Sequence, residues 1–293
     1  RITQALRRRN RLPWDARGKI VERSDVVSST PAVASVGSKW FHHHRPALLE
    51  IGGGCPRVAH AALQVSWRVD VLDASVDADV CNDLLFQNTL ARINSGRYTA
   101  VVGWVPGGDL SPARQRSCRP NGGAAALPSV ALQQLERTVV LLKAAKRAGA
   151  TVILSGARQS RAWHVASVQC LARSLHRISY DCCQWTAWKR PSVLLCSDPL
   201  IGRVLPRCIH GRGFCHGRLE SWVPRELLRT DPGVRVSWTE VGGQTSEGLA
   251  QTLVGWLTVQ EAAIRGTVTA SLGEESWLDP FISEYLTAVG GAA

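Results

Sequence analysis

Short apolar runs alternate with amphipathic segments along the middle of the chain. Apolar runs rich in Val, Leu, Ile and Ala predict buried strands at 47–51, 67–72, 98–105, 151–154 and 193–196. Apolar residues at spacings of three and four predict helices at 57–65, 84–94, 129–148, 163–176 and 249–264. Strands that alternate with helices are typical of an α/β fold, with a mainly parallel sheet and helices on both faces.

The same pattern divides the chain into three parts. Residues 1–45 are polar and basic and predict an N-terminal extension, 46–265 predict the α/β domain, and 266–293 predict a C-terminal tail. Within the domain, residues 199–240 lack a regular period and predict an irregular insertion. No segment approaches the roughly 18 consecutive apolar residues of a transmembrane helix, so we expect a soluble protein without a membrane span.

The first predicted strand contains Glu50 and runs directly into three glycines, Gly52, Gly53 and Gly54. Glycines after a strand let the backbone approach a nucleotide-like ligand, and the next helix supplies N–H donors. An acid at the end of the following strand, here Asp73, accepts hydrogen bonds from ribose hydroxyls. These five residues are therefore predicted to bind a cofactor; the alternative is a tight turn that has no ligand.

Four segments, spread over roughly residues 47–257, carry motifs in one consistent order. They are 49–63, 98–114 (YTAVVGWVPGGDLSPAR), 180–196 (YDCCQWTAWKRPSVLLC) and 208–215 (CIHGRGFC). Together they resemble C5-cytosine DNA methyltransferases, especially the divergent, degenerate methyltransferase-like domains of retroelement-type reading frames in protists and algae. The resemblance implies a Rossmann-like methyltransferase fold, S-adenosylmethionine as the cofactor and nucleic acid as the partner.

Two catalytic groups of that family have no counterpart in this chain. The resemblance places the nucleophilic Cys of the family on Gly107, and glycine has no side chain for covalent catalysis. The acidic segment of the family falls on residues 154–158 (LSGAR), which contain no carboxylate. Cys118, in the following loop, is either a substitute nucleophile or, our preferred interpretation, an ordinary thiol. We therefore assign no catalytic residue, and a non-enzyme is favoured over an enzyme.

The charge of the chain favours an anionic partner. The net charge is +12, and only five of the 35 basic residues are Lys. The planar guanidinium of Arg suits phosphate, so nucleic acid, with RNA favoured, is the expected partner alongside other protein subunits; a GC-rich coding sequence is the alternative origin of the Arg content. Arg114, Arg116 and Arg119 are the candidate nucleic-acid contacts. The 11 Trp residues either stack on bases or fill the core and interfaces.

The nine Cys residues form no ladder of spaced pairs, which favours reduced, buried thiols. Cys208, His210, Cys215 and His216 are residue types that bind zinc. A structural zinc site usually shows two separated ligand pairs with a hairpin between them. This short cluster does not, so we predict packed thiols and no metal.

The favoured function is a catalytically degenerate methyltransferase-fold protein that serves as a structural or RNA-binding subunit of a larger assembly, such as an organellar ribonucleoprotein. The chain contains no Met, and its first segment, 1–23, is rich in Arg. Both features favour a processed protein in an organelle, and the mitochondrion is the favoured organelle. The cytoplasm and the nucleus are the alternatives. Two other functions stay open: an active S-adenosylmethionine-dependent nucleic-acid methyltransferase, and a sensor that binds S-adenosylmethionine without turnover.

Overall fold

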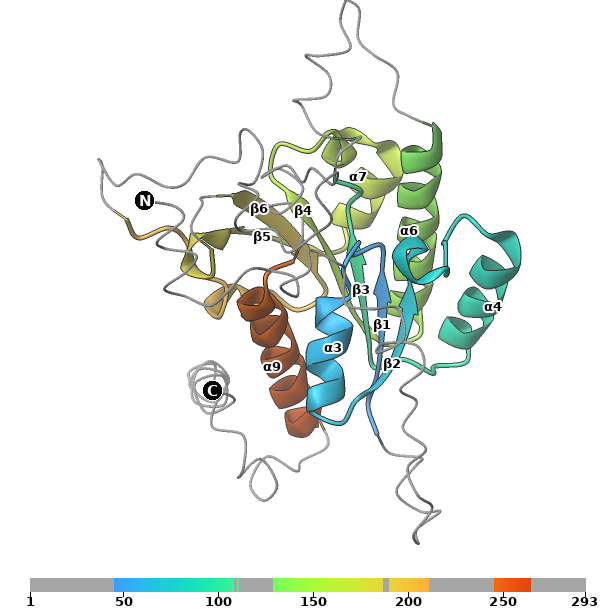
Figure 1. Cartoon of the computed structure of the whole chain (residues 1–293), viewed down its shortest axis with the longest axis horizontal. Coiled ribbons are helices and arrows are strands. Elements are labelled where there is room, and N and C mark those ends of the chain that lie inside the picture. Colours follow the sequence, from blue (N-terminus) through green and yellow to red (C-terminus); the bar gives the residue numbers. More distant parts are fainter. Residues whose placement is uncertain (1–44, 108–109, 111–128, 187–189, 211–244, 265–293) are drawn as a thin grey trace, which may run out of the picture.

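The computed structural model describes residues 45–107, 110, 129–186, 190–210 and 245–264. These residues form one six-stranded mixed sheet with helices on both faces (Figure 1), so the predicted α/β class is confirmed. The predicted extension up to residue 44, the tail and most of the predicted insertion, from residue 211 onward, lie outside the described residues.

Six strands form the sheet in the order β2-β1-β3-β4-β6-β5. Their bounds are β1 Ala47–Ile51, β2 Arg68–Leu72, β3 Ala100–Trp104, β4 Thr151–Ala157, β5 His176–Asp181 and β6 Pro191–Cys196. The first four strands pair in parallel, and β6 is antiparallel to both of its neighbours, β4 and β5. The sheet is therefore mixed, and the expectation of a mainly parallel sheet holds only for its first four strands.

The length of one connection explains the reversed strand. Only nine residues separate the end of β5 from the start of β6. A parallel crossover needs about a dozen residues or more, whereas an antiparallel connection needs few. The short connection therefore forces β6 to run back along β5, and β6 then fills the space between β5 and β4.

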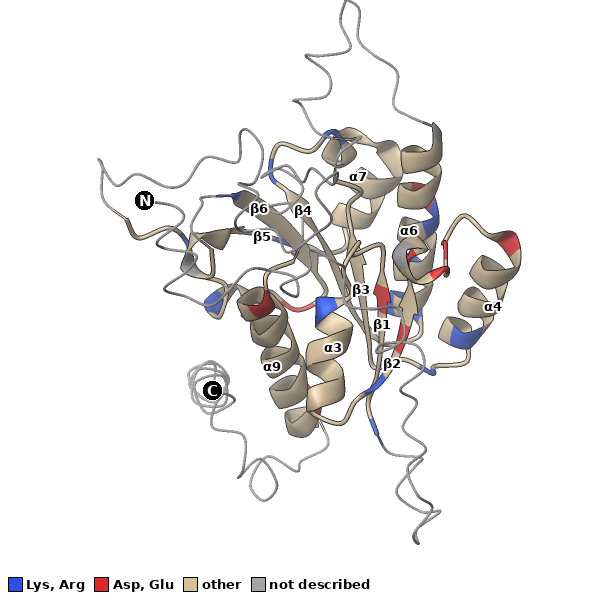
Figure 2. Cartoon of the chain, in the orientation of Figure 1, with Lys and Arg blue, Asp and Glu red and all other residues tan. Residues whose placement is uncertain are grey.

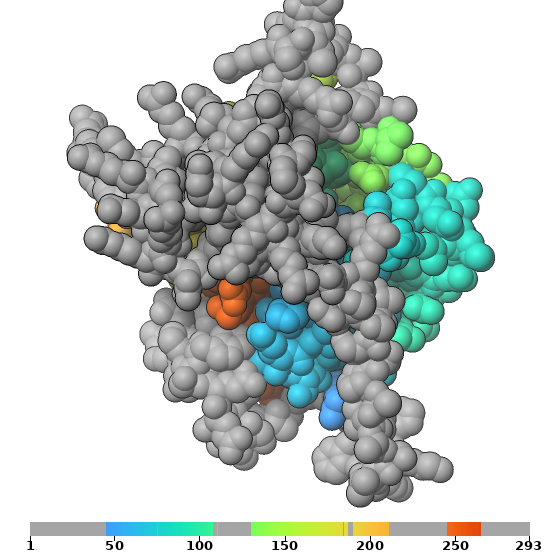
Figure 3. Space-filling view, viewed as in Figure 1, coloured from blue at the N-terminus to red at the C-terminus, as the bar shows by residue number. Residues whose placement is uncertain are grey.

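Five α-helices of the described residues cover the two faces of the sheet. They are α3 Arg57–Gln64, α4 Asp83–Asn94, α6 Ser129–Arg147, α7 Ala166–Ala172 and α9 Glu247–Ile264. Helices α3 and α9 lie side by side on one face, as Figures 1 and 3 show, and α4, α6 and α7 cover the other. Alternate residues of β1 point to opposite faces of the sheet. Leu48 packs under α3 and α9, while Leu49 and Ile51 pack under α6. This alternation buries every residue of β1.

The predicted helix 163–176 is wrong at both ends. Arg161–His164 form a 3-10 turn, α7 is limited to Ala166–Ala172, and His176 begins β5. Strand β5 was not predicted because it is an edge strand that pairs only with β6, and its first two residues are exposed. An edge strand with polar, exposed positions lacks the continuous apolar run of a central strand.

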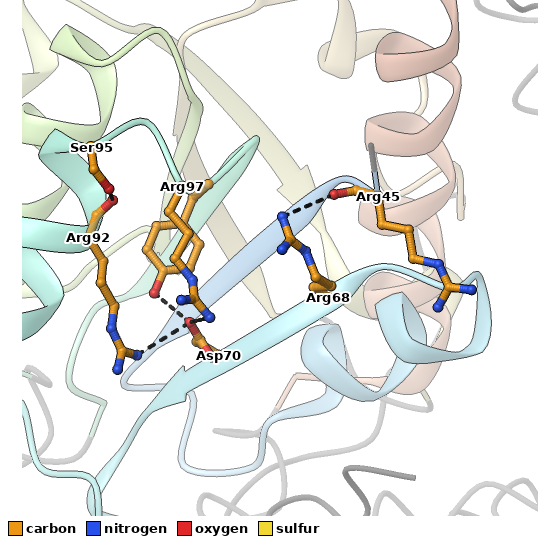
Figure 4. A network of polar contacts seen from close by, with 7 residues as sticks. Arg45, Arg68, Asp70, Arg92, Ser95 and Arg97 are labelled. Atoms are coloured by element: carbon orange, nitrogen blue, oxygen red, sulfur yellow. Dashed lines mark hydrogen bonds and ion pairs between the residues drawn. The ribbon is translucent and has the colours of Figure 1, made fainter. Parts of the chain in front are cut away.

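Charged side chains protect the other edge strand, β2. Asp70 accepts a hydrogen bond from the Tyr98 hydroxyl at 2.6 Å. It also forms ion pairs with Arg97 at 3.3 Å and Arg92 at 3.7 Å (Figure 4). Charges on an edge strand oppose pairing with strands of other chains.

In the part of the chain that the structure describes, the Lys and Arg residues lie on several elements and form no single stripe (Figure 2). Among the described residues, no helix is long and apolar enough to cross a bilayer.

Candidate ligand-binding site

The strand order places a topological switch point between β1 and β3. From β1 the chain passes to β2 on one side, and it then crosses to place β3 on the other side of β1. In open α/β sheets, ligands bind outside the carboxyl ends of the strands at such a point. The predicted glycines follow the carboxyl end of β1, and Asp73 follows that of β2. The topology therefore brings the predicted residues to the edge of the sheet that favours a ligand.

A cavity of about 300 Å³ lies at this switch point. Its volume is at the lower end of the range for small-molecule sites, roughly 300–1,000 Å³. The lining residues come from the ends of three strands, the loop before α4 and the first half of α6: Gly52, Gly54, Leu72, Asp73, Ala74, Asp79, Val80, Trp104, Pro106, Gly107, Gln134 and Thr138. Three of the five residues predicted to bind a cofactor, Gly52, Gly54 and Asp73, line it.

The loop after β1 adopts a conformation that favours glycine. Gly52 and Gly54 have φ angles of +71° and +64°, in the left-handed region that residues with a Cβ rarely enter. The N–H of Gly52 donates to the carbonyl of Leu72 at 3.0 Å, and the N–H of Gly54 donates to Asp73 Oδ2 at 2.6 Å. These two hydrogen bonds tie the loop to the end of β2.

Asp73 is the buried carboxylate in the wall of the cavity. Its Oδ2 accepts the hydrogen bond from Gly54, and a carboxylate offers about four lone-pair positions in all. Because Gly54 fixes one oxygen, the carboxylate is held in place before a ligand arrives. This arrangement suits a ligand with neighbouring hydroxyls, such as a ribose.

Glu50 is fully buried and is not among the residues that line the cavity. Its Oε2 accepts a hydrogen bond from the N–H of Ala59 at 2.7 Å, in the first turn of α3. Its Oε1 accepts one from Trp104 Nε1 at 2.9 Å. Trp104 ends β3 and forms part of the cavity wall. Glu50 therefore fixes α3 and Trp104 on either side of the glycine loop, and its two oxygens point to these donors.

The protonation of Glu50 depends on two opposed effects. Burial raises the pKa of Glu50 to about 8, while hydrogen bonds from Ala59 and Trp104 act in the lowering direction. Nearby Asp73 adds a further raising effect. Removal from water contributes most to the raised pKa of Glu50, because a buried carboxylate loses its hydration. Near neutral pH the Glu50 side chain is therefore mostly protonated.

Several lining residues were not predicted from the sequence. Asp79 brings a second carboxylate to the wall, and its Oδ1 accepts the N–H of Cys81 at 2.8 Å. Gln134 and Thr138 come from α6, which packs against β3 although many residues separate them. Asp79 lies shortly after Asp73 in a segment without a regular apolar period, and no other feature of the sequence indicates that it belongs to the site. Together with the apolar side chains of the wall, the two acids suit a ligand that has a flat apolar part and carries amine and hydroxyl donors.

Both positions on which the resemblance places catalytic groups lie among the described residues. Gly107 lines the cavity, and a Cβ at this position would meet no atom of the described residues within 4 Å. At the other position, Ser155 is buried with its Oγ 2.9 Å from Tyr180 Oη. A Cβ on Gly156 would lie 2.7 Å from Cβ of Val105. Among the described residues of the cavity wall there is thus no thiol, and a side chain at residue 156 would clash with Val105.

Comparison with known proteins gave no relative. No protein-family model matches the chain, and no curated protein matches it. The predicted nucleic-acid contacts Arg114, Arg116 and Arg119, together with Cys118, lie outside the described residues.

The structure also adds Cys183 to two residues of the Cys/His cluster that the sequence pattern had already grouped. Cys208 and His210 lie next to Cys183, which comes from a different part of the chain. Cys215 and His216, the other two residues of the predicted cluster, lie outside the described residues.

Replacing Gly53 with Ala is expected to destabilise the glycine loop. A Cβ at this position would lie 2.8 Å from Glu50 Oε1 and 3.2 Å from Trp104 Cδ1. It would therefore displace the hydrogen bond between these side chains, and we expect the free energy of unfolding in urea to fall by about 1–3 kcal/mol. Gly107→Ala is the matched control, because its Cβ meets open space and should change stability by less than about 0.5 kcal/mol. Equal losses for the two variants would contradict the packing described for Gly53.

Proposed function

We propose that the chain is a catalytically degenerate domain of S-adenosylmethionine-dependent methyltransferase type, which binds S-adenosylmethionine or S-adenosylhomocysteine without transferring the methyl group. The observation that carries the proposal is the cavity at the switch point, where the glycine loop and the Asp73 carboxylate meet. This is the position and the chemistry that favour a nucleoside ligand in an open α/β sheet.

The residues of the cavity fit the adenosyl part of such a ligand. Asp73 is placed to accept hydrogen bonds from the ribose hydroxyls, and the glycine loop lets the backbone approach. Leu72, Val80 and Pro106 offer apolar surface to the base. When bound, S-adenosylmethionine supplies an electrophilic methyl group; the chain's own residues hold and orient the ligand.

The sheet is compatible with the same proposal. Strands β1 to β4 pair in parallel, as the fold that the resemblance implies requires, and helices cover both faces. The four motifs in order along the sequence then favour a methyltransferase-type domain over other doubly wound folds.

The absence of turnover is proposed from the two positions where the resemblance places catalytic groups. C5 methylation needs a thiolate to attack the pyrimidine ring, and Gly107 offers only hydrogen at the cavity wall. The second position, Ser155 and Gly156, is packed against Tyr180 and Val105 and has no carboxylate. Losing groups that act as a unit removes most of the rate enhancement of an enzyme.

Isothermal titration calorimetry tests the binding proposal directly. We expect S-adenosylmethionine and S-adenosylhomocysteine to bind the full chain with micromolar dissociation constants and one site per chain. Adenosine triphosphate is the matched control ligand, because the carboxylates of Asp73 and Asp79 repel phosphate charges. No heat of binding with either adenosyl ligand, or equal binding of adenosine triphosphate, would contradict the proposal.

A second proposed function rests on charge. The net charge of +12, carried mainly by Arg, supports a role as an RNA-binding or structural subunit of a larger assembly, for which an organelle such as the mitochondrion is the proposed location. Filter binding of a structured RNA is expected to weaken steeply as the salt concentration rises. Binding that is absent at low salt would contradict this role.

A further inference from the structure

Three metal-ligand side chains meet beside the edge strand β5. Cys183 lies in the 3-10 turn Cys182–Gln184, directly after β5. Cys208 and His210 lie on the loop that follows the later 3-10 turn Pro199–Arg203. One ligand atom from each of these three side chains lies within 4.8 Å of the other two. The cluster is separate from the cavity at the switch point, since it shares no residue with the cavity wall.

The backbone around the cluster is fixed by hydrogen bonds between the two segments. The N–H of Asp181, the last residue of β5, donates to the carbonyl of Pro206 at 3.1 Å. The N–H of Cys208 donates in return to Asp181 Oδ2 at 3.0 Å. The end of β5 and the loop are therefore held together before any metal binds. Ligands held in place by surrounding hydrogen bonds are what a metal site requires.

The two adjacent cysteines of the turn face different surroundings. Cys182 is part of the hydrophobic core under α9, with its Sγ 3.7 Å from Oγ of Ser192. Cys183 instead lies beside Cys208, and its side chain is only 5% exposed. The turn therefore uses one cysteine for packing and places the other in the cluster.

The distances and the residue types suit zinc. The Sγ of Cys208 lies 3.4 Å from Nδ1 of His210. Zn–S and Zn–N bonds of usual length in a tetrahedral site separate sulfur and nitrogen ligands by about 3.5 Å. Thiolate and imidazole ligands together favour zinc over the hard cations magnesium and calcium, which prefer oxygen.

We propose that Cys183, Cys208 and His210 bind one Zn²⁺ ion through two Sγ atoms and Nδ1. Both thiols release their protons to solvent as the Zn–S bonds form, and no oxidation or reduction takes place. The ion joins the end of β5 to the loop after β6, and so fixes the edge of the sheet. Cys183 precedes Cys208 by 25 residues in the sequence, so the sequence pattern did not connect it with the cluster at 208–216.

Substitution of cobalt for zinc gives the sharpest test, because it reports the ligands in the wild-type chain. The full chain is purified under reducing conditions, depleted of metal and titrated with Co²⁺. We expect saturation at one ion per chain, with thiolate-to-cobalt charge-transfer absorption and the visible bands of tetrahedral cobalt, both lost on adding Zn²⁺. Histidine-only binding, for example at His42, His43 and His44, gives no thiolate charge transfer and does not imitate the site.

Two variants locate the ligands. Cys183→Ser and Cys208→Ser are each expected to lower the affinity for zinc by at least a hundredfold and to weaken the charge-transfer absorption. Cys170→Ser is the matched control, because Cys170 is an exposed free thiol on α7 and should leave metal binding unchanged. Wild-type protein that shows no thiolate charge transfer, or a disulfide between Cys183 and Cys208 in the freshly reduced protein, would overturn the proposal.

Discussion

Replacing Glu50 with Gln is expected to remove a pH dependence of stability that the wild-type protein shows between about pH 5 and pH 8. Burial raises the pKa of Glu50 in the folded chain from 4.5 to about 8. The folded chain therefore keeps a proton that the unfolded chain releases. Stability from this group is fully present below pH 4.5 and is lost as the pH rises through about 8.

The expected magnitude follows from the size of the pKa shift. Each unit of pKa difference corresponds to about 1.4 kcal/mol, so the wild-type chain loses about 3–4 kcal/mol relative to Glu50→Gln between pH 5 and pH 8. Urea denaturation of both proteins at the two pH values measures this difference, and other titrating groups cancel because they are shared. If the stability of the wild type relative to Glu50→Gln stays constant or increases from pH 5 to pH 8, Glu50 is ionised in the folded chain. The N–H donors of Ala59 and Trp104 would then outweigh the effect of burial.

Replacing Asp73 with Asn is expected to weaken binding of S-adenosylhomocysteine by about ten- to a hundredfold. Asn keeps the shape of the side chain but has one oxygen acceptor in place of two and no charge. Its oxygen can accept either the N–H of Gly54 or a ligand hydroxyl well, so one of the two donors faces an amide nitrogen. Calorimetric titration of the variant measures the loss.

Asp70→Asn is the matched control for Asp73→Asn. Asp70 lies on β2, the strand that Asp73 directly follows, but its carboxylate faces Tyr98 and Arg97 and does not line the cavity. We expect this variant to bind S-adenosylhomocysteine as the wild type does. If Asp70→Asn weakens binding as much as Asp73→Asn, the effect comes from a general change in β2, and the ligand does not contact Asp73.

The sequence pattern predicted the central part of the fold because burial there leaves a strong signal. Strands β1, β3 and β4 are buried runs, and α6 has a clear apolar face, so each was predicted close to its actual bounds. Strand β5 was missed because an exposed edge strand has no such run. The reversal of β6 depended on the length of the preceding connection, which becomes visible only once β5 is known.

The sequence predicted only those residues of the candidate site that lie at the ends of predicted strands. The glycines and Asp73 lie at the ends of predicted strands, so the order of elements was enough to place them together. Gln134 and Thr138 reach the cavity through the packing of α6 on β3, and no local pattern encodes that contact. Cys183 reaches Cys208 in the same way, through the pairing of β5 with β6 and the loop beyond it.

Glu50 belongs to the predicted binding motif but does not line the cavity. Its position at the end of β1 predicted a contact with the cofactor, but its two oxygens accept hydrogen bonds from α3 and Trp104. Gly53 packs against the same carboxylate. These contacts make Glu50 and Gly53 positioning residues for the loop, and the contacts we propose with the ligand belong to Gly52, Gly54 and Asp73.

Incubation with S-adenosylmethionine that carries a radioactive methyl group tests binding without transfer most directly. The full chain is mixed with the labelled compound and with DNA and RNA, and the protein-bound, nucleic-acid and free fractions are then counted separately. We predict label bound to the protein as intact S-adenosylmethionine, released by excess S-adenosylhomocysteine, and none in nucleic acid. Label recovered in 5-methylcytosine, or no label retained by the protein, would contradict this prediction.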